Sequence, residues 1–278
     1  MSVTAASEIT RQAKSNLAFA LNILPKERRE DAGIFYAFCR TIDDLADAPG
    51  LPLEQRQAAL ELWQSGLRNG FAAPDALQLQ VVALRDRHQI PNHLLGAIID
   101  GCLMDLHPQR FQTWDDLSRY IWNVACAVGL VSIRLFGCTD PASAHYAVTL
   151  GHALQLTNIL RDIGEDLANG ARIYLPLADL ARFDYSEQDL LARVDDARFR
   201  ALMAHEADRA DALFREAATC LPAADRAALL PARIMGEIYQ VLLEKMRSGG
   251  FGVLHQRYHV SKVRKLAILS KYLMSVRA

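Results

Sequence analysis

Two groups of acidic side chains lie where helices are expected to end. Asp43, Asp44 and Asp47 directly precede Ala48-Pro49-Gly50, a sequence typical of a turn. The negative end of the helix dipole disfavours carboxylates there, and like charges one turn apart repel by about 0.2–0.5 kcal/mol per pair. Such a cluster therefore indicates a cation, or another compensating group, that the local sequence does not supply.

A second group breaks the same local rule. Asp162, Glu165 and Asp166 share one helix face and are followed closely by Asn169-Gly170, a pair that often ends helices. Both groups are surrounded by apolar residues. Either group alone would be common on a solvated helix face, but local inconsistencies that occur twice in one chain are expected at a functional site.

Carboxylates in this arrangement point to divalent metal chemistry. Magnesium takes one or two carboxylates and completes its shell with water and substrate phosphates. Two acidic helix ends facing each other across a bundle would hold a diphosphate between Mg²⁺ ions, with Mn²⁺ as an alternative. Zinc is disfavoured because no histidine or cysteine shares these faces. Glycosidase chemistry uses two carboxylates and would leave the others unexplained.

Helical periodicity dominates the sequence, and strand signals are almost absent. Thr113 with Asp116, and Ser186 with Asp189, have the spacing of helix N-caps. The predicted helices span residues 5–23, 26–47, 53–68, 75–88, 91–106, 114–137, 141–168, 187–194, 197–219, 230–248 and 262–276, with a long loop at 169–186. Without a linker, these predict one all-α domain over residues 1–278, with sites built from facing helices.

Composition limits the partners and the location of the chain. Its 31 Lys and Arg nearly balance 32 Asp and Glu, so no overall field favours nucleic acid. The five cysteines form no CxxC pair, which indicates a reducing cytoplasm. No signal-peptide core opens the sequence, and the longest apolar run, 124–133, is too short to span a bilayer. We expect a cytoplasmic protein without a transmembrane segment that contacts the inner membrane face peripherally.

Four stretches of this sequence resemble the squalene/phytoene synthase family, and the similarity extends from about Ser15 to Leu266. The stretches are YAFCRTIDDLAD, DLSRYIWNVACAVG, QLTNILRDIGEDLANGARIYLP and EIYQVLLEKMRSGGFGVLHQRYHVSKVRKL. The resemblance implies a class I isoprenoid (terpenoid) synthase fold, which is a helical bundle around a central cavity. The chain departs from the family pattern at Trp122 and Cys126, and Gly170-Ala171-Arg172 carries one residue more than usual.

The resemblance also implies roles for individual residues. The implied catalytic residues are Asp43, Asp47, Tyr120, Asp162 and Asp166, of which Tyr120 matches a tyrosine involved in proton handling. The implied metal site comprises Asp43, Asp44, Asp47, Asn158, Asp162, Glu165 and Asp166. The implied diphosphate-binding residues are Tyr36, Arg40, Gln155, Asn158, Arg161, Arg172, Tyr239 and Arg257.

The implied reaction is the Mg²⁺-dependent head-to-head (1'-1) condensation of two farnesyl diphosphates to presqualene diphosphate or squalene. The main alternative is a phytoene synthase that condenses two geranylgeranyl diphosphates. A non-catalytic helical relative that acts as an assembly or binding protein is less favoured, because both acidic groups are complete. Squalene synthases of the family use NADPH, but no Gly-rich dinucleotide fingerprint supports NADPH here.

Overall fold

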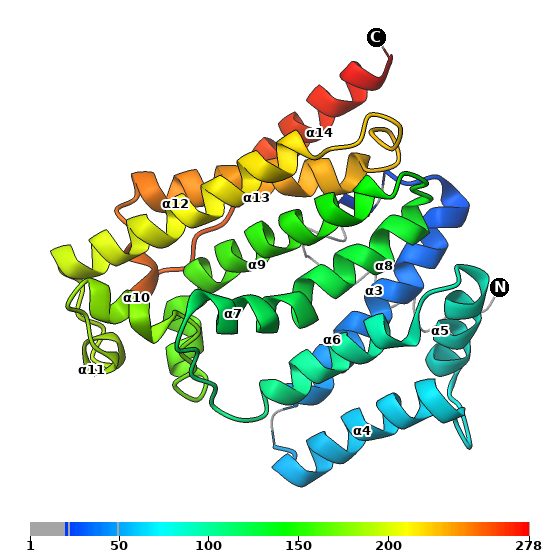
Figure 1. Cartoon of the computed structure of the whole chain (residues 1–278), viewed down its shortest axis with the longest axis horizontal. Helices are drawn as coiled ribbons and strands as arrows, with labels where there is room; N and C mark the ends of the chain where they lie inside the picture. The colour runs from blue at the N-terminus through cyan, green and yellow to red at the C-terminus, as the bar shows by residue number, and fades with distance from the viewer. Residues whose placement is uncertain (1–19, 22, 49, 278) are drawn as a thin grey trace.

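The computed structural model describes residues 20–21, 23–48 and 50–277, and these residues form helices without any β-strand. The elements are α3 (Lys26–Ala46), α4 (Leu53–Asn69), α5 (Ala76–Arg87), α6 (Asn92–Met104), α7 (Trp114–Ile121), η1 (Trp122–Cys126), α8 (Ala127–Phe136), α9 (Ala142–Ala168), α10 (Leu177–Arg182), α11 (Glu187–Leu191), α12 (Ala197–Thr219), α13 (Leu230–Ser248), η2 (Gly252–Leu254) and α14 (Lys262–Arg277) (Figure 1). The predicted all-α class is confirmed.

Most predicted helices agree with the structure to within two residues at each end, while the predicted helix 5–23 lies almost wholly outside the described residues. Three predictions were wrong in detail. The predicted loop 169–186 contains the short helix α10. The predicted helix 187–194 stops at Leu191, shortly before Arg193 takes a left-handed backbone conformation (φ 56°). The predicted helix 114–137 is interrupted by η1, a π-helical turn.

The helix starts follow local capping chemistry. Thr113 and Ser186 each accept a hydrogen bond from the backbone N–H three residues later, and their own backbone N–H groups donate to the carboxylates of Asp116 and Asp189. Both predicted N-caps are thereby confirmed. Asp75 forms a similar box at the start of α5 that the sequence analysis did not single out. These caps satisfy N–H groups that would otherwise lack partners.

Two apolar cores hold the helices together. One core joins side chains of α3, α4, α5, α6 and α8, and the other joins α7, α9, α10, α12 and α13. Trp122 packs against both cores. The continuous run α7–η1–α8 passes between α6 and α9, which places α9 beside both the central run and α12 (Figure 1).

The central run, Trp114–Phe136, is the one described helix that is long and apolar enough to cross a membrane by length and composition. It packs against α6 on one side and α9 on the other, which is the environment of an internal helix. Residues 122–125 and 128–130 nevertheless keep partial solvent access. The bundle therefore does not close completely over this apolar helix.

Candidate active site

The first acidic group lies at the C-terminal end of α3, as predicted. Arg40 pairs with Asp43 at 3.1 Å and with Asp44 at 2.5 Å, so one guanidinium neutralises two of the carboxylates. Asp47 is the C-cap residue of the helix. Tyr36 lies one turn before Arg40 and is largely buried. Burial lowers the pKa of Arg40, but Asp44 and Asp43 raise it overall, and Tyr36 adds a smaller raising effect.

Asp43 is held in an unfavourable electrostatic position. Desolvation at this crowded helix end raises its pKa, although its side chain is half exposed. Arg40 opposes the shift, while Asp47 and Asp44 add to it by repulsion. A divalent cation, which carries more charge than a shared arginine, would stabilise the ionised form of this carboxylate.

The second acidic group lies on the last turns of α9. Arg161 forms a two-pronged ion pair with Asp162, whose Oδ1 also accepts a hydrogen bond from Arg257 Nε at 3.0 Å. Arg257 Nη1 lies 3.3 Å from Glu165 Oε2. Tyr239 of α13 is buried against Arg161 and contributes to the raised pKa of that arginine. The predicted diphosphate-binding arginines thus lie directly on the predicted metal ligands.

Asn158 has a buried oxygen without a partner. Its Nδ2 donates to Gln155 Oε1 at 3.3 Å, one turn back on α9, while its Oδ1 is buried and accepts no hydrogen bond from the protein. A buried amide oxygen without a donor costs free energy unless a ligand satisfies it. An oxygen next to carboxylates suits Mg²⁺, so the residues present fit the predicted metal.

Asp166 is the most strongly perturbed acid of the second group. Burial, followed by repulsion from Asp162, raises its pKa to about 7, and Arg172 partly opposes the shift. The carboxylate therefore exchanges a proton near neutral pH when no metal is bound. A bound cation would compete directly with that proton.

The two acidic helix ends face the same space. Arg172 Nη2, in the loop after α9, lies 2.8 Å from Asp47 Oδ1 at the end of α3. The extra residue of this loop is absorbed by consecutive left-handed conformations at Gly170 (φ 84°) and Ala171 (φ 55°), after which Arg172 points back to α3. A cavity of about 410 Å³ lies here, lined by Asp47, Arg56, Asp105, Leu106, Pro108, Asn169, Gly170 and Arg172.

Asp105, which the sequence analysis missed, lies beside this cavity. It accepts hydrogen bonds from the hydroxyls of Tyr120 and Tyr174, each at 2.8 Å. Burial raises the pKa of Asp105, and the two hydroxyls and Arg172 oppose the shift. Asp105 is the C-cap of the apolar helix α6, so the rule that flagged the other acids at helix ends would have found it.

Arg56 was also missed and also lines the cavity. Its Nη1 donates to the carbonyl of Ala46 at 2.8 Å and so covers the end of α3. Its Nε is buried without an acceptor. Since α4 shows no unusual pattern around this arginine, only the fold reveals its proximity to Asp47.

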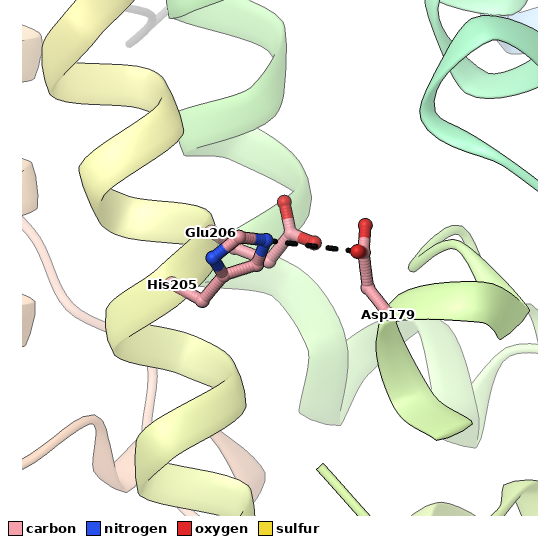
Figure 2. A group of neighbouring side chains, drawn as sticks. All are labelled: Asp179, His205 and Glu206. Carbon is pink, nitrogen blue, oxygen red and sulfur yellow. Dashed lines mark ion pairs between the residues drawn. The ribbon is translucent and has the colours of Figure 1, made fainter. Parts of the chain in front are cut away.

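A third cluster, away from the predicted site, has the composition of a metal site. Asp179 of α10 and His205 and Glu206 of α12 bring ligand atoms within 4.8 Å of one another (Figure 2). Arg209 already occupies this cluster: it pairs with Asp179 at 3.0 Å and with Glu206 at 2.5 Å, and stacks 4.8 Å over the Trp114 ring. A built-in cation therefore balances these acids, and a metal ion would have to overcome its repulsion.

The fold and the site together define a class. The described residues form an all-helical bundle that matches solved isoprenoid synthases of the squalene synthase type. The chain belongs to the squalene/phytoene synthase family, whose model matches residues 10–264. Members of this family are prenyltransferases that join prenyl diphosphates head to head and use divalent metal ions.

Relatives with assigned names fall on two branches of the family. The chain is 35% identical to a 15-cis-phytoene synthase of Synechocystis, over 96% of this chain and 84% of the relative. It is 34% identical to a presqualene diphosphate synthase of Rhodopseudomonas palustris, over 93% of this chain and 92% of the relative. These names agree on the reaction type and differ in substrate and product.

Solved structures agree with this assignment. The squalene synthase HpnC of Alicyclobacillus acidocaldarius matches with a TM-score of 0.79 at 30% identity, over 88% of this chain and 93% of that chain. A dehydrosqualene synthase solved with a ligand matches with a TM-score of 0.83 at 26% identity, over 98% and 95% of the two chains. The bundle is therefore shared along almost the whole length.

Proposed function

We propose that this protein condenses two farnesyl diphosphates head to head to presqualene diphosphate or squalene. One observation carries the proposal: the ends of α3 and α9 meet at a single cavity, where the Arg172–Asp47 ion pair joins them. A leaving diphosphate develops negative charge that must be neutralised from several sides. Of the proposed ligands, Asp47 and Arg172 line this cavity, and the remaining acids and arginines lie on the adjoining turns of α3 and α9, except Arg257, which pairs with α9.

Magnesium, when bound, would act as a Lewis acid that stabilises the departing diphosphate. The ligands that we assign to it lie on both helix ends: Asp43, Asp44, Asp47, Asn158, Asp162, Glu165 and Asp166. In the structure, four of these acids pair with Arg40, Arg161 or Arg257, namely Asp43, Asp44, Asp162 and Glu165. With these carboxylates bound to metal, Arg40, Arg161 and Arg257 would be free to donate their guanidinium N–H groups to phosphate oxygens.

Tyr120 is our candidate for the proton that must leave when the cyclopropane of presqualene diphosphate closes. Burial and the nearby Asp105 carboxylate raise the pKa of Tyr120 well above its usual range, so the hydroxyl stays protonated at neutral pH. Its proton is directed at Asp105 Oδ2. Tyr120 would therefore take the substrate proton on its oxygen while it passes its own proton to Asp105.

The farnesyl assignment rests on two further supports. The presqualene diphosphate synthase relative is matched over nearly equal shares of both chains, and the two solved structures above are squalene-type synthases. Several relatives named phytoene synthase favour geranylgeranyl diphosphate as the second candidate substrate.

A product assay separates the two substrates. Purified protein with Mg²⁺ is given farnesyl or geranylgeranyl diphosphate, each with and without NADPH, and the products are identified by mass spectrometry. We expect C30 products from farnesyl diphosphate at higher kcat/KM. A C40 product formed with the higher kcat/KM would move the protein to the phytoene branch, and absence of diphosphate release from both substrates would support a non-catalytic role.

We also propose that the protein works in the cytoplasm, with peripheral contact at the inner membrane face. The substrates and products of this reaction are oily, so exchange with a bilayer is an advantage. Cell fractionation tests the proposal. A peripheral protein should leave the membrane pellet when salt is raised, whereas protein that stays in the pellet after high-salt washing would contradict it.

A further inference from the structure

Helix α14 carries apolar side chains on two opposite faces. With 3.6 residues per turn, Ile268 and Leu269 point to the bundle side, and Ile268 is fully buried there. Val263, Leu266 and Met274 fall on the opposite side. A helix at the surface of a protein normally presents polar residues outward. The outer apolar face of α14 therefore needs another explanation.

This exposure is concentrated on α14. Of the eight large apolar side chains that the described residues leave exposed, four lie on this helix: Val263, Leu266, Leu273 and Met274. Val263 is 78% exposed and Met274 is 67% exposed. Single exposed apolar residues are ordinary, but an aligned set marks an interaction surface. In Figure 1 the C-terminal part of α14 projects beyond the rest of the bundle.

The charged side chains of α14 itself are all positive. The sequence of α14, KVRKLAILSKYLMSVR, contains no acidic residue, although the whole chain is nearly neutral. Lys262 and Arg264 are exposed, and no described carboxylate lies within ion-pair distance of them. Lys271 is paired with Glu237 of α13 at 2.8 Å and is therefore not counted among the free charges.

The inner face fixes the helix in place. It packs against α13, where the Arg233 guanidinium lies 4.9 Å over the Tyr272 ring. Near its start, Lys265 is close enough to Arg161 of α9 for their repulsion to lower the lysine pKa, after the larger effect of burial. The outer face is thus held on a firmly packed helix next to the candidate active site.

We propose that the outer face of α14 docks on the surface of an anionic lipid bilayer. Its apolar side chains would enter the boundary between head groups and acyl chains, and Lys262 and Arg264 would contact lipid phosphates, as in interfacial helices. A second copy of this chain fits less well, because a two-fold contact through α14 would bring like charges together. Docking through α14 would assign the proposed membrane contact to one helix face, and it does not depend on the condensation reaction.

Vesicle flotation without substrate tests this docking surface. The probes are phosphatidylcholine vesicles with and without phosphatidylglycerol, at low and high salt. One variant replaces three apolar residues, Val263→Ser, Leu266→Ser and Met274→Ser. Its matched control replaces three similarly exposed leucines elsewhere, Leu62→Ser, Leu79→Ser and Leu191→Ser. A second variant, Lys262→Gln with Arg264→Gln, is compared with Arg68→Gln plus Arg119→Gln.

The wild type should float with the anionic vesicles and lose binding in high salt. Both α14 variants should partition at least ~10-fold more weakly, while both controls bind like the wild type. Equal binding of variants and controls would overturn the proposal. Failure of the wild type to bind anionic vesicles at low salt would also overturn it. If the wild type does not bind vesicles but self-associates, and the α14 variant loses this self-association, the face would instead bind a second copy of the chain. Because no substrate is present, none of these outcomes depends on the condensation assay.

Discussion

The Tyr120 hydroxyl donates a hydrogen bond of 2.8 Å to Oδ2 of Asp105, a partly buried carboxylate at the end of α6. Tyr174 donates to the other oxygen of the same carboxylate, and its ring stacks on Tyr120 with centroids 5.3 Å apart. The Phe111 ring packs against both tyrosines, with centroids 5.4 Å from Tyr120 and 6.2 Å from Tyr174. The orientation of Tyr120 is therefore fixed by an acid on one helix and a ring from the loop after α9.

Replacing Asp105 by asparagine tests whether this acid serves Tyr120. An amide keeps the shape but presents one acceptor and one donor, so one of the two hydroxyls loses its acceptor. We expect kcat to fall by ~10²-fold or more with a much smaller change in KM, since a positioned proton acceptor contributes about 10²- to 10⁴-fold. The Tyr174→Phe variant keeps the Tyr120 bond and should retain more activity. An Asp105→Asn enzyme with normal kcat, beside an inactive Tyr120→Phe enzyme, would mean that Tyr120 acts without Asp105.

Asp43→Ala should separate activity from stability. The exposed pair with Arg40 contributes little to folding, on the order of 0–1 kcal/mol, whereas a lost metal ligand removes charge stabilisation worth ~10²-fold or more in rate. Asp86→Ala is the matched control, because Asp86 of α5 also pairs with an arginine but belongs to neither acidic group and does not line the cavity. Product formation and thermal unfolding are measured for both variants. Wild-type turnover by the Asp43→Ala protein would remove this residue from the mechanism.

The raised pKa of Asp166, about 7, predicts how pH changes the metal-free protein. An unfolded aspartate titrates near ~4, so the folded state holds this proton more tightly. The contribution of Asp166 to stability is fully present below that value and is lost as pH rises through about 7. We expect Mg²⁺ to raise Tm more at about pH 8 than at about pH 6, because it binds the deprotonated carboxylate. Asp166→Asn should flatten this difference, and a Mg²⁺ effect independent of pH in the wild type would contradict the assignment.

Arg209 should prove essential to the third acidic cluster. Glu206 is fully buried, and burial raises its pKa to about 7 even with Arg209 beside it. Removing one partner of a buried ionic network typically costs ~3–5 kcal/mol, so Arg209→Ala should lower Tm strongly. Addition of Mg²⁺ or Zn²⁺, or of EDTA, should leave Tm of the wild type unchanged if Arg209 is the resident cation. A clear Zn²⁺-dependent rise in Tm would instead make Asp179, His205 and Glu206 a metal site.

The sequence allowed the helices to be predicted more fully than the contacts between them. Periodicity and capping pairs such as Thr113 with Asp116 act over a few residues, so helix positions follow from local chemistry. Arg56 was missed because its importance comes from neighbours that are distant in the chain, whereas Asp105 was overlooked although it ends a helix as the flagged acids do. The π-helical turn η1, which packs between α6 and α9, was also missed, because no residue pattern in the sequence marks it.

The Arg172–Asp47 ion pair predicts that Arg172 contributes to diphosphate binding. Both groups line the cavity between the helix ends, so Arg172 is placed to exchange its carboxylate partner for a diphosphate oxygen. Arg172→Gln keeps the length of the side chain roughly but removes the charge. We expect inorganic diphosphate, in the presence of Mg²⁺, to bind ~10-fold more weakly, because charge-assisted hydrogen bonds contribute about 1.5–3 kcal/mol.

Arg247→Gln is the control, since Arg247 also forms partly exposed ion pairs, with Asp208 and Asp211, and lies on α13 away from the cavity lining. Isothermal titration calorimetry measures both affinities. If the two variants bind diphosphate equally well, Arg172 only joins α3 to the loop after α9, and the cation that receives the leaving group must be sought among Arg40, Arg161 and Arg257. If only Arg172→Gln is impaired, one residue accounts both for the junction of the two helix ends and for part of the diphosphate affinity.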